Sequence, residues 1–339
     1  MVGLTLTRAH EPLVEVRDLT KVYARRGRGW SGAGSDRVHA IDGVSFSMWP
    51  GEVLGLVGES GCGKSTTGMA LMLQEKVTSG EIFFQGIGMI EKAKGKTRLA
   101  FTRAAQLVFQ NPYEAFNPRH TIRESISEPI KIHFPGDPSL QEHLLLQAME
   151  RSGLTPPETF LDRFPHQLSG GQLQRIAIAR AIAVEPKFLV ADEPVAMLDV
   201  SVRASVLNLF RKFADELCMA ILYISHDIST MRYVCSRIAV MYLGRIVEIG
   251  PTEDVLERPR HPFTKALIAA VPSMNGQARV RGALGILSNA AGPPLGCRFQ
   301  PRCPNALPEC AEQVPLLRDM PDGCGVACHL FNAPEQGAL

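Results

Sequence analysis

The chain has 339 residues, which is long enough for one large α/β domain with an appendage. Its 36 basic and 34 acidic residues leave a net charge of +2, so no overall field favours nucleic acid or an anionic membrane surface as a partner. No run of about 18 uncharged apolar residues occurs, and the N-terminus lacks the apolar core of a signal peptide. We therefore expect a soluble, cytosolic chain whose eight cysteines are thiols or metal ligands rather than disulfides.

Two segments near the N-terminus alternate apolar and polar side chains. Residues 12–18 and Val44–Trp49 are therefore predicted to form two antiparallel strands. The basic, glycine-rich stretch Arg25–Asp36 between them is interpreted as a mobile surface loop. Tyr23 could stack on a nucleobase, although a lone tyrosine at the end of a strand is more often a packing residue.

The next segment, Val53–Thr66, reads VLGLVGESGCGKST and predicts a buried strand that leads into a phosphate-binding loop. The fixed positions of the pattern G-x-x-x-x-G-K-[ST] are Gly58, Gly63, Lys64 and Ser65. The glycines free backbone N–H groups for an anion, Lys64 would reach the outer phosphates, and Ser65 would bind Mg²⁺. A helix is expected over Ser65–Leu73. A bulky reagent on the Cys62 thiol is expected to block nucleotide entry, unless that thiol is unreactive.

Further along, the pattern predicts a strand over Glu81–Gly86, a surface turn over Glu91–Arg98 and a short strand over Gln106–Phe109. Gln110 follows the last of these. Residues 111–165 are rich in prolines and include an amphipathic helix over Gln141–Arg151, so we expect a helical subdomain inserted into the core.

Three later segments place polar residues at a helix N-terminus or directly after a buried strand, which are positions where nucleotide-binding proteins commonly hold phosphate, Mg²⁺ and the attacking water. Ser169 is predicted to cap a helix that follows LSGGQ, a second plausible anion site. The apolar strand Phe188–Ala191 ends in Asp192 and Glu193, and the strand Ala220–Ile224 is followed by His226 within two residues. Strand ends of this kind are where a doubly wound sheet places its chemistry.

The rest of the chain is predicted to form a hairpin over Ile238–Tyr242 and Arg245–Ile249, helices over Thr252–Leu256 and Phe263–Ala270, and a linker over Met274–Ala291. From Gly292 the chain is rich in proline and cysteine and has too little apolar pattern for a core of its own. Four cysteine thiolates could bind either an iron–sulfur cluster or a zinc ion, and this ligation would stabilise the segment.

Over residues 12–250 the chain resembles the ATP-binding subunits of ABC transporters. The family motifs occur in order as Walker A (GESGCGKST), the Q-loop Gln110, the signature motif Leu168–Gln172, Walker B (FLVADE), the D-loop Leu198-Asp199 and the switch His226. The resemblance implies an α/β P-loop NTPase fold, with a RecA-like core, an antiparallel β subdomain and an inserted helical subdomain over about 111–165. We expect domains at 1–255 (nucleotide binding), 256–291 (helical linker) and 292–339 (cysteine-rich extension).

The resemblance also assigns roles to residues. The catalytic residues would be Lys64, Gln110, Glu193 as general base and His226; Mg²⁺ would be held by Ser65, Gln110 and Asp192. Nucleotide contacts would come from Tyr23, Gly58, Glu59, Ser60, Gly61, Cys62, Gly63, Lys64, Ser65, Thr66, Gln110 and Asp192, and from Ser169, Gly170, Gly171 and Gln172 across a dimer. The sequence departs from the family pattern at Ala196-Met197, where the family commonly has Ser-Ala before the D-loop. This difference affects the expected contacts of the D-loop across the dimer, but not the assignment as an ATPase.

The C-terminal part narrows the resemblance to the oligopeptide and dipeptide importers. It rests on HPFTKALIAAVP (His261–Pro272) and on GCRFQPRCPNALPEC followed by VACH, and the F-type member is favoured over the D-type. The implied function is an ATPase that drives peptide uptake from the cytoplasmic face of the inner membrane. Its implied partners are a second ATPase subunit, two permeases and an external solute-binding protein, with no nucleic acid. The alternatives are a soluble ABC ATPase acting on nucleic acid or ribosomes, and an importer of a solute such as a nickel chelate or glutathione.

The resemblance further implies that Cys297, Cys303, Cys310 and Cys328 hold a [4Fe-4S] cluster, with zinc as the alternative metal. Cys324 is close enough in sequence to compete with Cys328 as the fourth ligand. Because the Walker A loop is distant in sequence and shares no ligand with the cluster, ATP binding is expected to survive loss of the metal.

Overall fold

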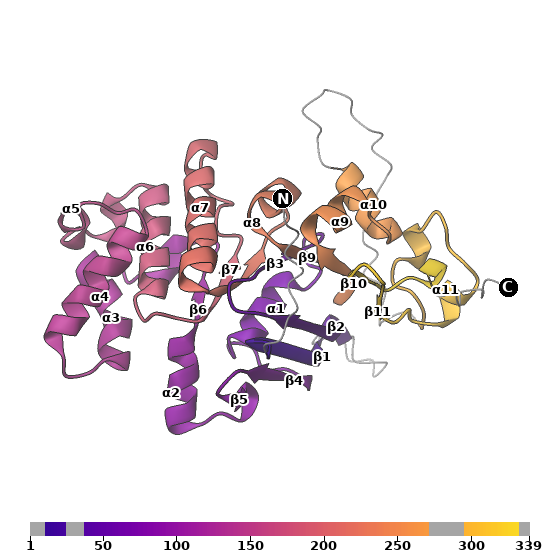
Figure 1. The fold of residues 1–339 in the computed structure, drawn as a ribbon, viewed down its shortest axis with the longest axis horizontal. Helices are drawn as coiled ribbons and strands as arrows, with labels where there is room; N and C mark the ends of the chain where they lie inside the picture. Colours follow the sequence, from indigo (N-terminus) through magenta and orange to yellow (C-terminus); the bar gives the residue numbers. More distant parts are fainter. Residues whose placement is uncertain (1–10, 25–36, 271–294, 332–339) are drawn as a thin grey trace, which may run out of the picture.

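The computed structural model describes residues 11–24, 37–270 and 295–331. These residues form a four-stranded and an eight-stranded sheet, with a group of helices at one end of the long axis and the C-terminal segment at the other (Figure 1). The loop expected over Arg25–Asp36 and the linker expected over Met274–Ala291 lie outside the described residues. Within the described ranges, no helix is long and apolar enough to cross a membrane.

The larger sheet has the strand order β11-β12-β10-β9-β3-β8-β7-β6. Its strands are β3 (Val53–Val57), β6 (Ala105–Val108), β7 (Phe188–Asp192), β8 (Ala220–Ile224), β9 (Arg237–Tyr242), β10 (Arg245–Pro251), β11 (Arg318–Asp319) and β12 (Gly325–Val326). The neighbours from β9 through β3, β8 and β7 to β6 run parallel. Every residue of β3 and β8 is buried, as continuous apolar runs predict for strands covered on both faces. The carboxyl ends of β3, β6, β7 and β8 therefore meet at one edge.

The smaller sheet confirms the predicted antiparallel pairing near the N-terminus. It contains β1 (Val14–Ala24), β2 (Arg37–Met48), β4 (Ser79–Phe84) and β5 (Gly88–Met89), in the order β2-β1-β4-β5. Val14 pairs with Met48 in β2 and with Phe84 in β4. These side chains and Leu54 of β3 belong to one buried apolar cluster, so the smaller sheet packs on the larger one.

Helices and a short 3-10 turn accompany the two sheets: α1 (Lys64–Leu71), η1 (Ile90–Lys92), α2 (Gly95–Ala104), α7 (Val200–Leu217), α8 (Ile228–Val234), α9 (Thr252–Glu257) and α10 (Pro262–Ala269). The predicted surface turn over Glu91–Arg98 is wrong from Gly95 onward, where α2 begins. This helix is anchored by Phe101, whose buried ring makes an edge contact with Phe84 at a centroid distance of 5.6 Å. The 18-residue helix α7 was not predicted.

A helical subdomain lies at one end of the molecule, beyond α7 (Figure 1). It comprises η2 (Pro112–Ala115), α3 (Ile122–His133), α4 (Pro138–Arg151), α5 (Glu158–Leu161), η3 (Pro165–Gln167) and the packed helix α6 (Gly170–Ile182). Thr121 and Glu124 form a capping box that starts α3. Arg180 of α6 donates to the carbonyl oxygens of Ser125 and Ala115, at 3.0 and 3.1 Å. The subdomain expected over 111–165 is thus tied to the helix that follows it.

The C-terminal segment packs on the larger sheet. It contains η4 (Gln300–Arg302), α11 (Glu309–Glu312), β11, β12 and η5 (His329–Phe331). Val326 of β12 pairs with Glu248 of β10. The buried ring of Phe299 contacts Tyr242 and Phe263, at centroid distances of 5.3 and 5.6 Å. Sheet pairing and aromatic packing hold its described residues, and Phe299 and Cys324 belong to the main hydrophobic cluster.

Candidate functional site

The predicted phosphate-binding loop connects β3 to α1. Gly63 is the N-cap residue of α1 and adopts a left-handed conformation (φ 109°) that favours glycine. A Cβ atom on Gly63 would lie 2.0 Å from the carbonyl oxygen of Ala40, and one on Gly58 would lie 2.1 Å from that of Met241. Both glycines are therefore required by close backbone packing, which presents the N-terminal end of α1 to an anion.

Lys64 is held at this loop in a position suited to phosphate. Its side chain is 6% exposed, and Nζ donates to the carbonyl oxygens of Gly58 at 2.9 Å and Glu59 at 3.0 Å. Nζ also lies 3.9 Å from Cys62 Sγ, so none of these three partners is a carboxylate, and a bound anion would supply the missing opposite charge. The lysine and the N-terminal end of α1 therefore fit the phosphates of a nucleotide.

Two acidic residues at the end of β7 contact polar side chains from the start of α1 and from the ends of the neighbouring strands β6 and β8. Ser65 Oγ donates to Asp192 Oδ1 at 3.1 Å. Gln110 Nε2 donates to Glu193 Oε2 at 3.1 Å, and His226 Nδ1 lies 3.0 Å from Glu193 Oε1. The structure thus brings together five residues that are spread over 161 positions of the sequence, as the parallel strand order requires.

These oxygen donors suit a magnesium ion that also binds phosphate. Burial raises the pKa of Asp192, the nearby Glu193 carboxylate raises it as well, and the hydrogen bond from Ser65 lowers it. A cation would offset the cost of the buried charge. Because Mg²⁺ is usually held by one or two carboxylates together with substrate phosphates, Ser65, Asp192 and Gln110 fit the role predicted for them.

Tyr23 lies beside the start of α1. The residue is 37% exposed, Lys21 Nζ lies 4.6 Å from its ring centre, and Thr66 at the start of α1 is a near neighbour of its hydroxyl. An exposed aromatic face next to the phosphate loop is compatible with the predicted stacking on adenine.

Not every residue of the loop presents its side chain to a ligand. The Cys62 side chain is 3% exposed and belongs to the core cluster beneath the smaller sheet, and burial raises the pKa of its thiol. Of the residues predicted to contact nucleotide, Cys62 can therefore contribute only its backbone, and the expected block by a thiol reagent is not favoured. The side chain of Glu59, another residue of the loop, forms an ion pair with Arg302. No motif or spacing in the sequence predicts this contact.

The signature motif forms the N-terminus of α6. Ser169 Oγ accepts from the backbone N–H of Gln172 at 3.3 Å, and Gln172 Oε1 accepts from the Ser169 N–H at 3.0 Å, which completes the expected cap. A Cβ atom on Gly171 would lie 2.8 Å from Val202 of α7, whereas Gly170 has open space. Figure 1 shows α6 and α1 well separated along the long axis. This motif is therefore not part of the cluster around Lys64.

The turn before the D-loop is exposed where the sequence departs from the family pattern. Met197 is 62% exposed, while Val195 and Leu198 on either side are buried. Asp199 is the N-cap residue of α7, but its side chain makes no capping hydrogen bond. The residue is exposed to solvent.

The predicted metal ligands of the C-terminal segment are electrostatic neighbours. The pKa of Cys328 is raised to about 11, chiefly by burial and to a smaller extent by the nearby thiols of Cys297, Cys303 and Cys310. Cys324 instead lies beside Arg260 and Asp322. However, no three His, Cys, Asp or Glu side chains within the described ranges are grouped as a metal ion would require. The prediction of a metal-binding extension is therefore not supported by this arrangement.

Comparison with known families matches two parts of the chain. Residues 41–196 match the family model "ABC transporter". Residues 247–310 match "Oligopeptide/dipeptide transporter, C-terminal region". The second match spans most of β10, the helices α9 and α10, and three of the four cysteines predicted as metal ligands.

Curated relatives match over nearly the whole chain. The "Oligopeptide transport ATP-binding protein AppF" of Bacillus subtilis is 40% identical over 95% of this chain and 98% of its own length. The "Dipeptide transport ATP-binding protein DppF" of Haemophilus influenzae is 42% identical over 94% of this chain and 97% of its own length.

A solved structure similar to this one is the post-hydrolysis dimer of the ATP-binding cassette MJ0796 bound to ADP and Pi, at a TM-score of 0.61 and 26% identity. The superposition covers 70% of this chain and 98% of the MJ0796 chain. The cbiO1 protein of Clostridium perfringens, part of the ABC transporter complex cbiONQ, gives a TM-score of 0.62 and 27% identity, covering 74% and 92%. At 40% and 42% identity to such relatives over nearly its whole length, the chain belongs to the ATP-binding subunits of ABC transporters, in the oligopeptide/dipeptide family.

Proposed function

We propose that this chain is the ATP-hydrolysing motor subunit of an importer that takes up peptides. The observation that carries the proposal is the position of Glu193, with Gln110 and His226 on its two carboxylate oxygens and Asp192 next to it. The relatives, whose names describe oligopeptide and dipeptide transport, support peptides as the cargo. The names of these relatives do not support a role on nucleic acid or ribosomes. The alternative to peptides as the cargo is a non-peptide solute, and uptake assays can distinguish the two.

The geometry assigns a task to each group in hydrolysis. Lys64 and the backbone N–H groups of the loop would hold the β- and γ-phosphates. Ser65, Asp192 and Gln110 would hold Mg²⁺, which neutralises charge on those phosphates when it is bound. Glu193 would accept a proton from the attacking water. Its two hydrogen-bond partners keep its carboxylate in one orientation, so that this transfer needs no rearrangement.

We also propose that the complete site forms between two cassettes. The Ser169–Gln172 motif lies away from Lys64 in this chain, so it would serve the nucleotide of a facing ATPase subunit, and two ATP molecules would stabilise the pair. The solved dimer of a similar cassette supports such an arrangement. The assembly would be a heterodimer bound to two permeases at the cytoplasmic face of the membrane, and an external solute-binding protein would deliver the cargo.

For the C-terminal segment we propose a [4Fe-4S] cluster on Cys297, Cys303, Cys310 and Cys328, with zinc as the alternative. Support comes from the Cys297 N–H, which donates to the Cys310 carbonyl oxygen at 2.8 Å, and from the nearness of the Cys297, Cys303 and Cys310 thiols to that of Cys328. Cys324 lies in a separate environment, where its N–H donates to Asp322. The proposal requires the thiols to converge on one centre when the metal binds. Iron, sulfide and zinc analysis after anaerobic purification tests it. Loss of iron in Cys328→Ser but not in Cys324→Ser is expected, and stoichiometric zinc without iron would overturn the choice of metal.

The transport proposal is tested by co-purification of the full-length chain. We expect it to be recovered with two permeases and a second ATPase in the membrane fraction. Recovery with ribosomes or nucleic acid, and not with membranes, would contradict it.

A further inference from the structure

An ion pair joins the C-terminal segment to the Walker A loop. Arg302, at the end of η4, donates from Nη1 and Nη2 to the two carboxylate oxygens of Glu59, at 3.0 and 2.8 Å. The two side chains are only 14% and 19% exposed. The guanidinium group also lies 5.5 Å from the ring centre of Tyr242 and donates to its hydroxyl at 3.1 Å. A bidentate pair that packs on an aromatic ring, largely away from water, has a well-defined geometry.

Glu59 also contacts the phosphate-binding lysine through its backbone. Its carbonyl oxygen accepts from Lys64 Nζ at 3.0 Å, beside the bond from Lys64 to Gly58. One residue is therefore held by Arg302 through its side chain and by Lys64 through its main chain. A displacement of Glu59 would change the position of the ammonium group that receives the phosphates.

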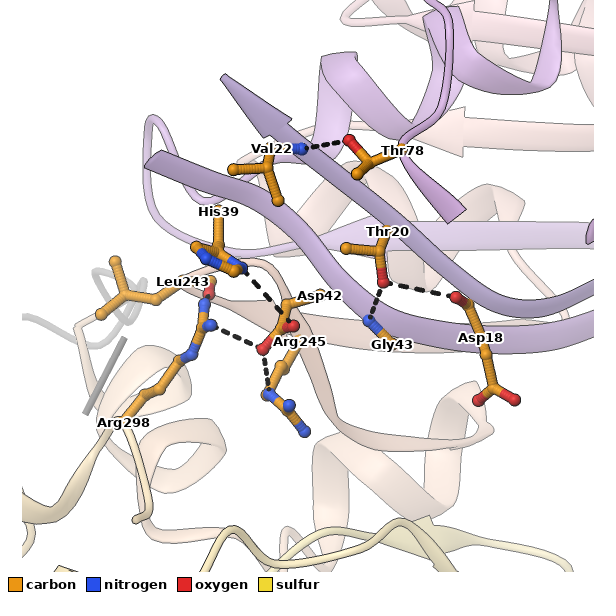
Figure 2. Close-up of polar contacts among 10 residues, drawn as sticks. All are labelled: Asp18, Thr20, Val22, His39, Asp42, Gly43, Thr78, Leu243, Arg245 and Arg298. Atoms are coloured by element: carbon orange, nitrogen blue, oxygen red, sulfur yellow. Dashed lines mark hydrogen bonds and ion pairs between the residues drawn. The ribbon is translucent and has the colours of Figure 1, made fainter. Parts of the chain in front are cut away.

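A second arginine of the same segment contacts the neighbouring turn. Figure 2 shows Arg298 reaching the Asp42 carboxylate, which Arg245 also contacts, and the carbonyl oxygen of Leu243. The N–H of the next residue, Gly244, donates to the Cys62 carbonyl oxygen in the Walker A loop at 2.8 Å. The C-terminal segment thus contacts the loop directly at Glu59 and supports it indirectly near Cys62.

We propose that Arg302 is a positioning residue for nucleotide binding, which holds the Walker A loop in its binding conformation through Glu59. The C-terminal segment thereby sets the affinity of the site for ATP. Removal of the guanidinium group leaves a half-buried carboxylate without its charged partner, and the loop is expected to move so that this carboxylate reaches water. The inference rests on ATP binding at Lys64 and does not depend on the cargo.

The test measures the Kd for a fluorescent ATP analogue with Mg²⁺ on the purified full-length chain, together with KM and kcat of the ATPase reaction. In Arg302→Met we expect Kd and KM to rise about threefold to tenfold, the range expected for loss of a half-buried bidentate pair. We expect kcat to stay within about twofold, because Arg302 does not contact Glu193 or His226. Arg302→Lys keeps the charge but not the two-point contact, and should fall between Met and wild type.

A double-mutant cycle separates this role from general support of the fold. Glu59→Gln should weaken binding to a similar extent, and Arg302→Met should add little in the Glu59→Gln background. The matched control is Asp322→Asn, which removes an ion pair between the segment and Arg260 at a site that does not contact the loop. We expect its Kd to equal that of wild type.

Three results would overturn the inference: a Kd for Arg302→Met within twofold of wild type, full additivity in the cycle, or an equal loss of affinity in Asp322→Asn. Failure of the wild-type chain to bind the analogue would instead refute the assigned ATP site. The failure of one claim can therefore be told apart from the failure of the other.

Discussion

Replacing Glu193 by glutamine tests the assigned general base while preserving the shape of the site. In the structure, the two carboxylate oxygens face different partners, Gln110 Nε2 at 3.1 Å and His226 Nδ1 at 3.0 Å. A glutamine side chain can keep both contacts, since its oxygen can accept from Gln110 and its amide can donate to His226 Nδ1 when the ring adopts the tautomer with its proton on Nε2. We therefore expect the local geometry to persist in Glu193→Gln.

The expected loss is confined to the chemical step. A general base typically contributes about 10² to 10⁴ in rate, equal to about 3 to 5 kcal/mol of barrier. The contacts of Lys64 to Gly58 and Glu59, and the bond from Ser65 to Asp192, do not involve Glu193, so nucleotide affinity should change by less than about threefold.

The assay is single-turnover hydrolysis of radiolabelled ATP by the assembled ATPase, with Kd measured in parallel. His226→Gln provides a comparison, because it removes one partner of the carboxylate and leaves the base itself in place. A Glu193→Gln rate within a few-fold of wild type would refute the role assigned to Glu193. A large loss of affinity in the same variant would refute the view that binding and chemistry are separate here.

Three further predictions concern the loop and the buried groups near it. Gly63→Ala should abolish ATP binding, measured by the same Kd, because its Cβ would lie 2.0 Å from the Ala40 carbonyl oxygen; unchanged affinity would contradict this packing. Cys62 should react with iodoacetamide at least about tenfold more slowly than an exposed thiol in the same chain, since burial raises its pKa, and fast labelling would contradict the structure. Burial lowers the pKa of His261 to about 4, and its Nδ1 accepts from the Phe263 N–H, so the neutral ring is the folded form. The contribution of the neutral ring to the free energy of unfolding is fully present above about pH 6.5 and is lost as the pH falls toward 4, by up to about 3 kcal/mol. Urea unfolding midpoints measured against pH should fall over this range, and the fall should be smaller in His261→Asn.

The sequence predicted the parts of the fold that depend on local patterns. The strands that lead to Asp192 and His226 are short apolar runs, and parallel pairing then requires their ends to meet, so the cluster around Glu193 could be inferred. The cap that Ser169 forms at the start of α6 could also be predicted from the sequence, because a capping box involves only four consecutive residues.

Other features depended on contacts between distant residues. The helix α2 is fixed by one buried ring, Phe101, in an otherwise charged segment, and this pattern resembles a surface turn. The contact of Arg302 with Glu59 spans 243 positions and leaves no periodic trace. For the same reason the C-terminal segment was expected to be independent of the ATP site, whereas the structure places it against the Walker A loop. The grouping of its cysteines around a metal stays a prediction.

The central claim is that ATP hydrolysis at this site drives peptide uptake. The most direct measurement is uptake of a radiolabelled peptide by proteoliposomes that contain the complete transporter, with the solute-binding protein added outside and ATP enclosed at the face bearing this chain. We expect uptake with wild-type protein, and its loss in Glu193→Gln although that variant still binds ATP. Wild-type complex that hydrolyses ATP without accumulating peptide, or equal uptake by both proteins, would contradict the account.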